Sequence, residues 1–542
     1  MAMFIVVVDS TMMTVAVPTI VNDLDTSVSA VQSVIAMYSL VMAALMLTGG
    51  KLGSILGIRK AFLVGIILYG AGTLLAAISW NIFSLAFGWA LLEGMGAALL
   101  VPAAFTVVGA NYQGKNRAFA FGVLAGVQAT AAAIGPILGG LLTTYLSWRW
   151  GFGGQIVVAL AILPLIPFIL ELQQSGPRQE LDMWGVVLSS LGMLLLVLGF
   201  LVAGRYGWWD ARRPFELWGV ELNPLGLSPS PFLILSGLVL LVAFLHWQEF
   251  REKAGRMPLV QPRILSNTRF ITGASIYMVR SIFLTGLLFV LPLYMQAVLG
   301  FSAFQCGVAL LPFSASVFIV SMITAGWSEW VTPRKLIQIG LILMALGTLY
   351  LYAVTSTDMN IGTFVLPTIV LGTGMGLIMA QLVNLTLSSV QPEDTSEASG
   401  LNNAVGELGN SLGTAVIGSL LLVFFYSAAV DQISRQANLS YTFEQRNQVI
   451  VELEDAPDLD TEAGQREFFA DLPDNVKDGL PLILDDASVR ALQHTLLVIL
   501  VVIILTLLVS TFLSDERVSS KDRQRFRQLH PGSTQQTGAE GK

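Results

Sequence analysis

Long apolar stretches separated by short polar segments make up most of the chain. A helix that crosses a bilayer needs roughly 20 predominantly apolar residues. Fourteen stretches approach or exceed that length, and they lie near residues 3–20, 30–48, 61–78, 82–108, 118–142, 151–170, 183–203, 231–246, 270–296, 302–325, 335–354, 361–388, 400–429 and 491–513. The pattern predicts an all-α membrane protein with about fourteen transmembrane helices.

The first apolar stretch starts at Met3, close to the beginning of the chain. It lacks the positively charged segment and the small-residue cleavage site of a secretory signal peptide. We therefore predict that residues 3–20 form the first transmembrane helix after a short cytoplasmic lead.

Basic residues predict the orientation of these helices. If successive loops are assigned alternately to two sides, one side carries a basic C-terminal tail and Arg59, Lys60, Lys115, Arg117, Arg178, Arg251, Lys253, Arg256, Arg334 and Lys335. The short loops of the other side hold little more than Arg149, Arg205, Arg212 and Arg213. Lysine and arginine accumulate in cytoplasmic loops. We therefore predict a multi-pass protein of the cell (cytoplasmic or inner) membrane with both termini in the cytoplasm.

Tryptophans mark the predicted ends of the helices, as expected for side chains that favour the membrane–water boundary. Those near predicted ends are Trp80, Trp148, Trp150, Trp184, Trp208, Trp209, Trp247, Trp327 and Trp330. Trp89 is an exception, because it lies inside the fourth predicted helix.

Composition excludes most soluble functions. The chain is 54% hydrophobic and 12% charged, whereas a soluble protein carries about a quarter of charged residues. One cysteine, Cys306, and three widely spaced histidines offer no metal-ligand spacing. The sequence also lacks a GxxxxGK[ST] nucleotide-binding loop and any nucleophile–base cluster. We expect no enzyme activity, cofactor, metal or nucleic-acid partner, and we expect a monomer in the bilayer.

Residues 430–490 break the apolar pattern with an acidic segment on the predicted outer side. Two interpretations remain open, a small cap of short helices or a mobile loop. The acidity could concentrate cations near an outer opening, but a merely solvated segment is the simpler interpretation.

The chain also resembles itself. RKAFLVGIILYGAGTL from Arg59 matches RKLIQIGLILMALGTL from Arg334 at an offset of 275 residues. Further matches are Pro18 with Pro292 at 274, Gly94-Met-Gly with Gly374-Met-Gly at 280, and Gly122, Gly135 and Gly140 with Gly400, Gly413 and Gly418 at 278. Four matches in order at a nearly constant offset predict two homologous halves, with helices 1–6 repeated as helices 9–14.

The repeat divides the chain into predicted units. These are an N-terminal six-helix bundle (1–175), inserted helices 7 and 8 (176–268), C-terminal helices 9–13 (269–429), the acidic segment (430–490), helix 14 (491–513) and a cytoplasmic tail (514–542). Related halves of this kind place a substrate site between them near the middle of the membrane.

Four stretches resemble motifs of the major facilitator superfamily, in particular its fourteen-span drug:proton antiporter branch. They are FIVVVDSTMMTVAVPTI (Phe4–Ile20), GGKLGSILGIRK (Gly49–Lys60), GVLAGVQATAAAIGPILGG (Gly122–Gly140) and LDMWGVVLSSLGMLLLVLGF (Leu181–Phe200). The resemblance covers nearly the whole chain except the acidic segment. It implies the major facilitator fold, two six-helix bundles plus an inserted two-helix hairpin.

Two of these motifs carry glycine patterns. In the cytoplasmic loop motif, Gly50, Gly53 and Gly57 precede the basic pair Arg59 and Lys60, and their spacing predicts a close helix contact. By resemblance, this loop latches the two halves in the outward-facing state.

The antiporter motif comprises Gly122, Gly135, Pro136, Gly139 and Gly140. Its glycines permit close packing and its proline permits a bend. Both a gating role and a simple packing seam fit this pattern.

Three positions depart from the family pattern. Ser54 stands where the loop motif usually has aspartate, Ala90 where the fourth helix usually has arginine, and Thr414 where the second copy of the antiporter motif would have proline. The family's usual arginine therefore cannot be assumed to couple protons in this chain.

Four ionisable residues lie inside predicted helices, where charge is costly and therefore suggests function. They are Asp9, Glu93, Arg280 and Glu407, and Gln128 is an uncharged polar candidate. A buried carboxyl group holds its proton more tightly than one in water, which suits a proton carrier. A cationic substrate would compete with the proton for such a site.

Each of the four has an alternative interpretation. Asp9 matches the family's first-helix acid, or it hydrogen-bonds to Ser10 or Thr11. Glu93 replaces the missing arginine as a protonatable group, or it bonds across to helix 2 or 5. Arg280 lies about one turn from the repeat position of Asp9 (9 + 274 = 283). It either pairs with Asp9 or another acid or extends to the outer interface, and Glu407 is a candidate second proton site.

The sequence therefore favours a secondary transporter that exports hydrophobic or cationic small molecules in exchange for protons. Two alternatives remain open. One is a narrow-specificity carrier of an amino acid, siderophore or lipid-like metabolite, and the other is a non-transporting membrane sensor or scaffold.

Overall fold

Helices account for almost all of the computed structural model. It describes residues 1–111, 114–169, 181–211, 216–217, 220–221, 226–324, 327, 331–387, 389–390, 395–437, 442–455 and 474–513. In this part of the chain, 13 helices are long and apolar enough to cross a membrane, judged by length and composition. A further helix, α7 (Gly114–Tyr145), contains the shorter apolar stretch Thr130–Tyr145. The all-α prediction is confirmed, with one small β-hairpin as an addition.

The first six spans form the N-terminal bundle. Their elements are α1 (Ala2–Met12), η1 (Met13–Ala16), α2 (Val17–Asp23), α3 (Val28–Leu56), α4 (Ile58–Ala77), α5 (Ile82–Leu85), η2 (Ala86–Glu93), α6 (Gly94–Asn111), α7, α8 (Arg149–Ile162) and η3 (Leu163–Phe168). The inserted segment follows with α9 (Met183–Tyr206), β1 (Glu216–Leu217), β2 (Val220–Glu221), α10 (Pro229–Lys253) and α11 (Pro262–Leu265).

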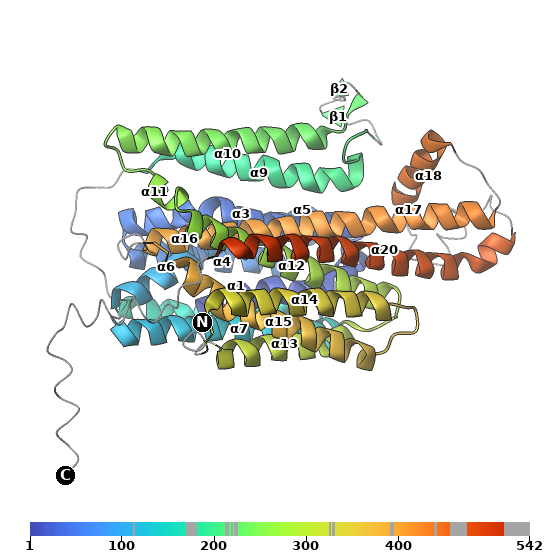
Figure 1. The fold of residues 1–542 in the computed structure, drawn as a ribbon, viewed down its shortest axis with the longest axis horizontal. Coiled ribbons are helices and arrows are strands. Elements are labelled where there is room, and N and C mark those ends of the chain that lie inside the picture. The colour runs from blue at the N-terminus through green and yellow to red at the C-terminus, as the bar shows by residue number, and fades with distance from the viewer. Residues whose placement is uncertain are drawn as a thin grey trace, which may run out of the picture.

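The C-terminal bundle repeats this arrangement. It comprises α12 (Thr268–Ala297), α13 (Ala303–Thr324), α14 (Pro333–Val354), α15 (Ile361–Leu387), α16 (Thr395–Leu412), η7 (Gly413–Ile417), α17 (Gly418–Gln436), α18 (Phe443–Asp455), α20 (Asp474–Val509) and η8 (Ser510–Phe512). The N-terminus and α11 lie toward one end of the helical body, called here the proximal end, whereas α18 and the β-hairpin lie at the distal end (Figure 1).

The acidic segment is largely helical where the structure describes it. Helix α17 continues to Gln436 and helix α20 begins at Asp474, so both helices extend beyond the predicted span ends at 429 and 491. Helices α17 and α20 extend beyond the other helices at the distal end, where α18 packs on them (Figure 1). Residues 456–473 lie outside the described part.

This helical cap has a small apolar core of its own. Its buried members are Ala429, Val430, Ile433, Ile450, Leu453, Ile483 and Ala487. Arg446 on α18 donates from Nε to Asp431 Oδ1 of α17 at 2.8 Å. Apolar burial and this ion pair therefore hold the cap together, and an acidic composition did not prevent it from folding.

Glycine contacts show the repeat in three dimensions. A Cβ at Gly96 would lie 2.7 Å from the Gly65 carbonyl oxygen, and a Cβ at Gly340 would lie 2.7 Å from that of Gly374. Neighbouring spans therefore touch through their backbones in both halves. The equivalent of Gly96 is Gly374, at an offset of 278 residues, so the predicted alignment of the two Gly-Met-Gly motifs at 280 is wrong by two residues.

The inserted hairpin covers the seam between the bundles. Helix α9 contributes Met193 and Val197 to an apolar cluster with residues of α3 and α16, namely Ala36, Leu40, Ala43, Leu408 and Leu412. Because α3 belongs to one half and α16 to the other, α9 shields one side of their contact from the surroundings.

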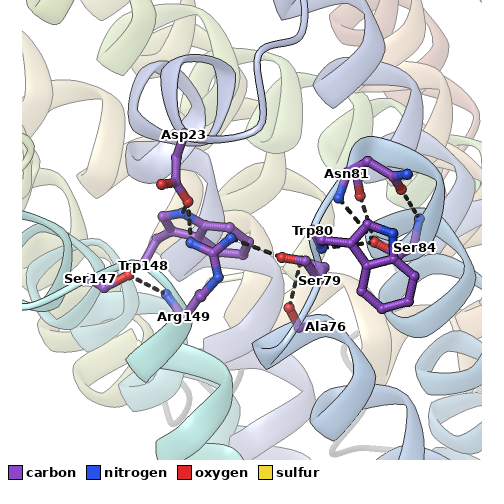
Figure 2. Close-up of polar contacts among 9 residues, drawn as sticks. All are labelled: Asp23, Ala76, Ser79, Trp80, Asn81, Ser84, Ser147, Trp148 and Arg149. Atoms are coloured by element: carbon purple, nitrogen blue, oxygen red, sulfur yellow. Dashed lines mark hydrogen bonds and ion pairs between the residues drawn. The ribbon is translucent and has the colours of Figure 1, made fainter.

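A polar cluster ties together the distal loops of the N-terminal bundle (Figure 2). The Arg149 guanidinium pairs with Asp23 and donates to the Ser79 carbonyl oxygen at 2.8 Å. Trp148 Nε1 donates to Asp23 Oδ2 at 2.9 Å, and the guanidinium lies over the Trp148 ring. The cluster explains why a basic residue occupies a loop on the side with few basic residues, because Arg149 has an acid and a carbonyl to bind there.

Candidate functional site

Three spans depart from regular α-helix beside the predicted ionisable residues. A 3-10 segment, η1, directly follows the helix that carries Asp9. The π-helix η2 carries both Trp89 and Glu93, and a second π-helix, η7, follows the helix that carries Glu407. Such π segments occur frequently at functional sites because they displace side chains from the regular helical register.

Asp9 is fully buried and its carboxyl group is held by two donors. Trp89 Nε1 donates to Oδ2 at 2.6 Å, and Gln155 Nε2 donates to Oδ1 at 2.8 Å. The Tyr69 hydroxyl in turn donates to Gln155 Oε1 at 2.6 Å. Side chains from α1, η2, α8 and α4 therefore converge on one carboxyl group.

The alternative role of Asp9 as a local helix-packing residue is wrong. Ser10 and Thr11 both donate to the Val7 carbonyl oxygen at 3.0 Å and leave the carboxyl group of Asp9 to Trp89 and Gln155. The contacts of Asp9 therefore bridge helices instead of capping its own turn.

Glu93 lies beside Asp9 and is also fully buried. Its neighbours are Asp9 and the hydroxyl groups of Tyr69 and Thr73, yet neither carboxyl oxygen has a hydrogen-bond partner within the described part of the chain. The predicted alternative of a bond to helix 2 or 5 is therefore wrong. Among the described residues, no basic side chain forms an ion pair with either acid.

We call Asp9, Glu93, Tyr38, Tyr69, Trp89 and Gln155 the acid cluster. Two acids share this enclosed space, and a second negative charge there would cost several kcal/mol without a counter-ion. The chemical capacity of the cluster is therefore to bind and release protons.

Sequence reasoning missed four members of the acid cluster. Trp89 carried a signal, because a tryptophan in the middle of a span does not fit the interfacial belt. Gln155 also carried one, because an amide in an apolar span needs a partner. Tyr38 and Tyr69 gave no signal beyond their position inside spans.

Arg280 and Glu407 lie together in the C-terminal bundle. The Arg280 guanidinium lies 4.3 Å from the ring centre of Tyr277 and donates to Ser281 Oγ at 2.9 Å. It forms no ion pair with Asp9 in the described structure, and its charge acts on Glu407 of the adjacent helix. The predicted pairing with Asp9 is therefore wrong, and the other acid near Arg280 is Glu407.

Glu407 differs from Asp9 and Glu93 in being only half-buried. Asn410 Nδ2 donates to its Oε2 at 3.1 Å, and Thr285 Oγ1 of α12 donates to Asn410 Oδ1 at 2.9 Å. A polar chain therefore links α12 to Glu407 across the seam between α12 and α16.

Packing places Arg280 about one turn from the repeat position of Asp9. Gly139 meets the Met12 backbone, and Ile417, its counterpart at the offset of 278, meets Gly286. Met12 and Gly286 differ by 274 residues, the offset of Pro18 and Pro292, so the repeat position of Asp9 is 283. The first half therefore carries an acid in this span, and the second half carries a base one turn away from the equivalent position.

The antiporter motif lines two contacts of α7. Gly139 faces the Met12 carbonyl oxygen of α1, and Gly140 faces the Ala303 carbonyl oxygen of α13. A Cβ at Gly307 of α13 would lie 2.6 Å from the Pro136 carbonyl oxygen. The motif therefore allows α7 to approach both the first span and the other half. The surroundings of Gly122 lie outside the described residues.

The two bundles meet in their distal halves. Gln296 Nε2 donates to the Val15 carbonyl oxygen at 3.0 Å, and the Phe304 amide donates to Thr144 Oγ1 at 3.0 Å. Gln32 of α3 donates to the Thr414 carbonyl oxygen at 2.9 Å. Ser411 Oγ donates to the Ala36 carbonyl oxygen at 2.6 Å, and these atoms likewise lie in the distal half of α3. These four hydrogen bonds between the bundles all lie in the distal half.

The loop motif packs differently from the prediction. A Cβ at Gly53 would meet nothing within 4 Å among the described residues, and one at Gly50 would lie 3.7 Å from Pro102 Cβ. The tight contact is made instead by Gly49, against the Ala98 carbonyl oxygen of α6. The predicted close contact at Gly50 and Gly53 is therefore wrong.

The other residues of the loop motif lie at the junction between the end of α3 and the start of α4. Gly57 ends α3 with a φ of 91°, a conformation that favours glycine. Arg59 is half-buried and Lys60 is exposed at the start of α4. The side chain of Ser54 lies outside the described part.

Gln128 is half-buried on α7, two turns before Gly135. No hydrogen bond joins it to the acid cluster within the described structure.

Comparison with known proteins identifies the family to which this chain belongs. A family model described as Major Facilitator Superfamily matches residues 1–414. The chain belongs to the Major Facilitator Superfamily. A bacterial homologue of the human lysosomal transporter Spinster, solved in an inward-facing and unoccupied conformation, matches this major facilitator fold with a TM-score of 0.56 and 14% identity, over 94% of this chain and 95% of the other.

Relatives of this major facilitator protein include an exporter and a resistance protein. The cephamycin export protein CmcT of Amycolatopsis lactamdurans is 30% identical over 420 residues, covering 77% of this chain and 82% of that protein. The puromycin resistance protein pur8 of Streptomyces alboniger is 31% identical over 425 residues, covering 77% and 80%. The chain is therefore a multi-pass membrane transporter of small molecules, akin to antibiotic and drug exporters, and not an enzyme.

Trp89→Phe tests the hydrogen bonding of Asp9. The variant keeps an aromatic ring but removes the Nε1 donor, so a buried carboxyl oxygen loses its partner at a cost of about 1–3 kcal/mol. We expect a lower melting temperature in thermal unfolding of the detergent-purified protein. The control is Trp80→Phe, because Trp80 is 69% exposed at the distal loops. Equal melting temperatures for the two variants would contradict the assigned bond.

Gly140→Ala tests the contact of α7 with the other half. The added methyl group would overlap the Ala303 backbone, which cannot rotate away as a side chain can. We expect the variant to reach the membrane but to transport at about a tenth of the parent rate or less, since overpacking costs about 1–3 kcal/mol. Gly154→Ala on α8 is the matched control, because its Cβ would meet nothing within 4 Å. Parent-like transport by Gly140→Ala would show that this approach is not needed.

Proposed function

We propose that this major facilitator protein exports hydrophobic or cationic small molecules from the cytoplasm in exchange for protons. The observation that carries the proposal is the acid pair Asp9 and Glu93, which is fully buried and has no basic partner within the described residues. A packing role alone does not account for the energetic cost of burying two carboxyl groups side by side.

The acid pair supports proton binding for an electrostatic reason. Two negative charges in one nonpolar enclosure repel each other, so at least one carboxyl group retains a proton until water or a cation reaches it. The hydrogen bonds from Trp89 and Gln155 stabilise the charge of Asp9 when it is ionised. Asp9 is therefore proposed as the group that ionises, and Glu93 as the neighbour that stays protonated beside it.

Exchange follows from competition between proton and substrate. A cation bound near the pair favours the ionised carboxyl group, and a bound proton weakens the attraction for that cation. By linkage the two effects are equal in free energy, so each ligand promotes release of the other. Glu407 is half-buried beside α3, where a substrate between the bundles could reach it.

The distal contacts support an inward-facing state. The bundles are joined by hydrogen bonds in their distal halves, so rocking about this seam would open the proximal half first. Basic residues predict that the proximal end faces the cytoplasm. The proposed cycle loads substrate from the cytoplasm in this state and releases it after the distal contacts break.

The substrate class rests on the relatives. A cephamycin exporter and a puromycin resistance protein both cover more than three quarters of this chain. A multidrug transporter, MdtP of Bacillus subtilis, is 26% identical over 78% of the chain. We therefore propose organic, antibiotic-like substrates, and a location in the cell membrane with both termini in the cytoplasm.

Asp9→Asn tests the exchange directly. The amide has nearly the same shape but cannot take up a proton, so export driven by an imposed pH gradient should fall by about tenfold or more. Efflux of a cationic dye from proteoliposomes, with and without the gradient, measures the loss. Asp23→Asn is the matched control on the same span, because Asp23 is partly exposed at the distal loops and lies outside the acid cluster. If Asp9→Asn pumped the dye as well as the parent, the proton assignment would be wrong.

A further inference from the structure

Tyr38 carries a buried hydroxyl group that the fold does not satisfy. The residue lies on α3 with 2% of its surface exposed, and its ring stacks on Trp89 with 5.7 Å between ring centres. Its hydroxyl has no hydrogen-bond partner within the described structure. A buried polar group without a partner is costly, and phenylalanine would provide the same stacking without that cost. The hydroxyl is therefore retained at the expense of stability.

The position of Tyr38 joins the two halves of the proposed machinery. On one side, its ring contacts Trp89, which holds Asp9. On the other side, α3 packs against α16, where Ser411 bonds to Ala36 and Leu408 shares an apolar cluster with Leu40. Glu407 immediately precedes Leu408 on α16. Tyr38 thus lies on a helix that packs both on the acid cluster and on α16, the helix that carries Glu407.

The ionisable groups around Tyr38 are almost all acids. Those that act on its hydroxyl are Asp9 from α1, Glu93 from η2 and Glu407 from α16. Tyr69 of α4 is the other titratable member of the acid cluster, and its hydroxyl is already committed to Gln155. Tyr38 therefore carries a buried hydroxyl that forms no hydrogen bond within the described part of the chain and that is influenced by acids of both bundles.

We propose that the Tyr38 hydroxyl is the proton link between Glu407 and the acid pair, an inference that rests on the proposed exchange function. A phenol can accept a proton on its oxygen while it donates its own, so it passes a proton without holding a charge. Glu407 gives its proton to the Tyr38 oxygen as the Tyr38 proton moves to the Asp9 carboxylate. Glu407 becomes negative, Asp9 becomes neutral and Tyr38 is unchanged.

In the present structure, the hydrogen bonds that would make this proton link are not formed. The hydroxyl reaches no acceptor at hydrogen-bond distance, so no proton crosses between the bundles while the distal seam is closed. The proposed rocking of the bundles would move α16 relative to α3 and bring the three groups into register. The link therefore closes only during the conformational change, which prevents a proton leak in the resting state.

Tyr38→Phe tests the link with little structural disturbance. The ring stack on Trp89 is kept and an unsatisfied hydroxyl is removed, so the melting temperature should be equal to or higher than that of the parent. Transport driven by a pH gradient should fall by about tenfold or more, whereas binding of a cationic dye should change by less than about twofold. A variant that is at least as stable, binds dye and yet does not couple to protons is not expected from a structural role.

Tyr294→Phe is the matched control. Tyr294 on α12 donates its hydroxyl to the Ser356 carbonyl oxygen at 2.9 Å, at the distal end and away from the acid cluster. Its loss should lower the melting temperature but leave pH-driven transport within about twofold of the parent. The opposite behaviour of the two variants separates coupling from stability.

The outcomes distinguish this inference from the function on which it rests. If the parent shows no pH-driven export, the proposed exchange function is overturned. If the parent couples and Tyr38→Phe couples equally well, only the link is overturned.

A double variant with Glu407→Gln adds a second test. A relay through both groups predicts that Tyr38→Phe causes no further loss in the Glu407→Gln background, because one broken step is enough. Independent, multiplying losses would overturn the link.

Discussion

The cost of burying ionisable groups in an apolar protein governs this structure. Asp9 can occupy the interior only because Trp89 and Gln155 donate to it, and Gln155 is in turn held by Tyr69. Four spans must therefore keep their relative positions to satisfy one carboxyl group. The N-terminal bundle is consequently organised around an acid as much as around its apolar contacts.

Close backbone packing makes that arrangement possible. Gly139 brings α7 against the Met12 backbone, next to the turn that carries Asp9, and Gly140 brings the same helix against the other bundle. One helix therefore contacts both the acid-bearing span and the moving seam. A change at either contact reaches the other through a rigid, tightly packed element, which is the physical basis that alternating access requires.

The two halves share a fold but not a charge pattern. The first half carries an acid, Asp9, in its first span, and the second half carries a base, Arg280, about one turn from the equivalent position. Asp9 is fully enclosed with Glu93, whereas Arg280 lies on a tyrosine ring close to a half-buried glutamate. The two similar halves therefore hold different ionisable groups, two enclosed acids in the first half and a base beside an acid in the second.

The sequence by itself determined the class of the protein. Apolar stretches of membrane length, a self-match at a nearly constant offset, and family-like motifs were enough to predict a duplicated helical transporter with an inserted hairpin. They also identified Asp9, Glu93 and Glu407, because a charge in an apolar run is visible without coordinates. These signals are local, or depend only on sequence comparison, and so they survive without a structure.

Only the tertiary structure decided which groups meet. Trp89 and Gln155 are separated from Asp9 by 80 and 146 residues, and their contact depends on how four helices rotate and on the π-helix that re-aims Trp89 and Glu93. The tight contact of Gly49, and not of Gly53, likewise depends on helix rotation that glycine spacing does not specify. The hydrophobic pattern determines which residues of a helix cross the membrane. In an almost uniformly apolar helix, however, the pattern does not determine how the helix is rotated about its own axis. That rotation decides which residues its side chains contact.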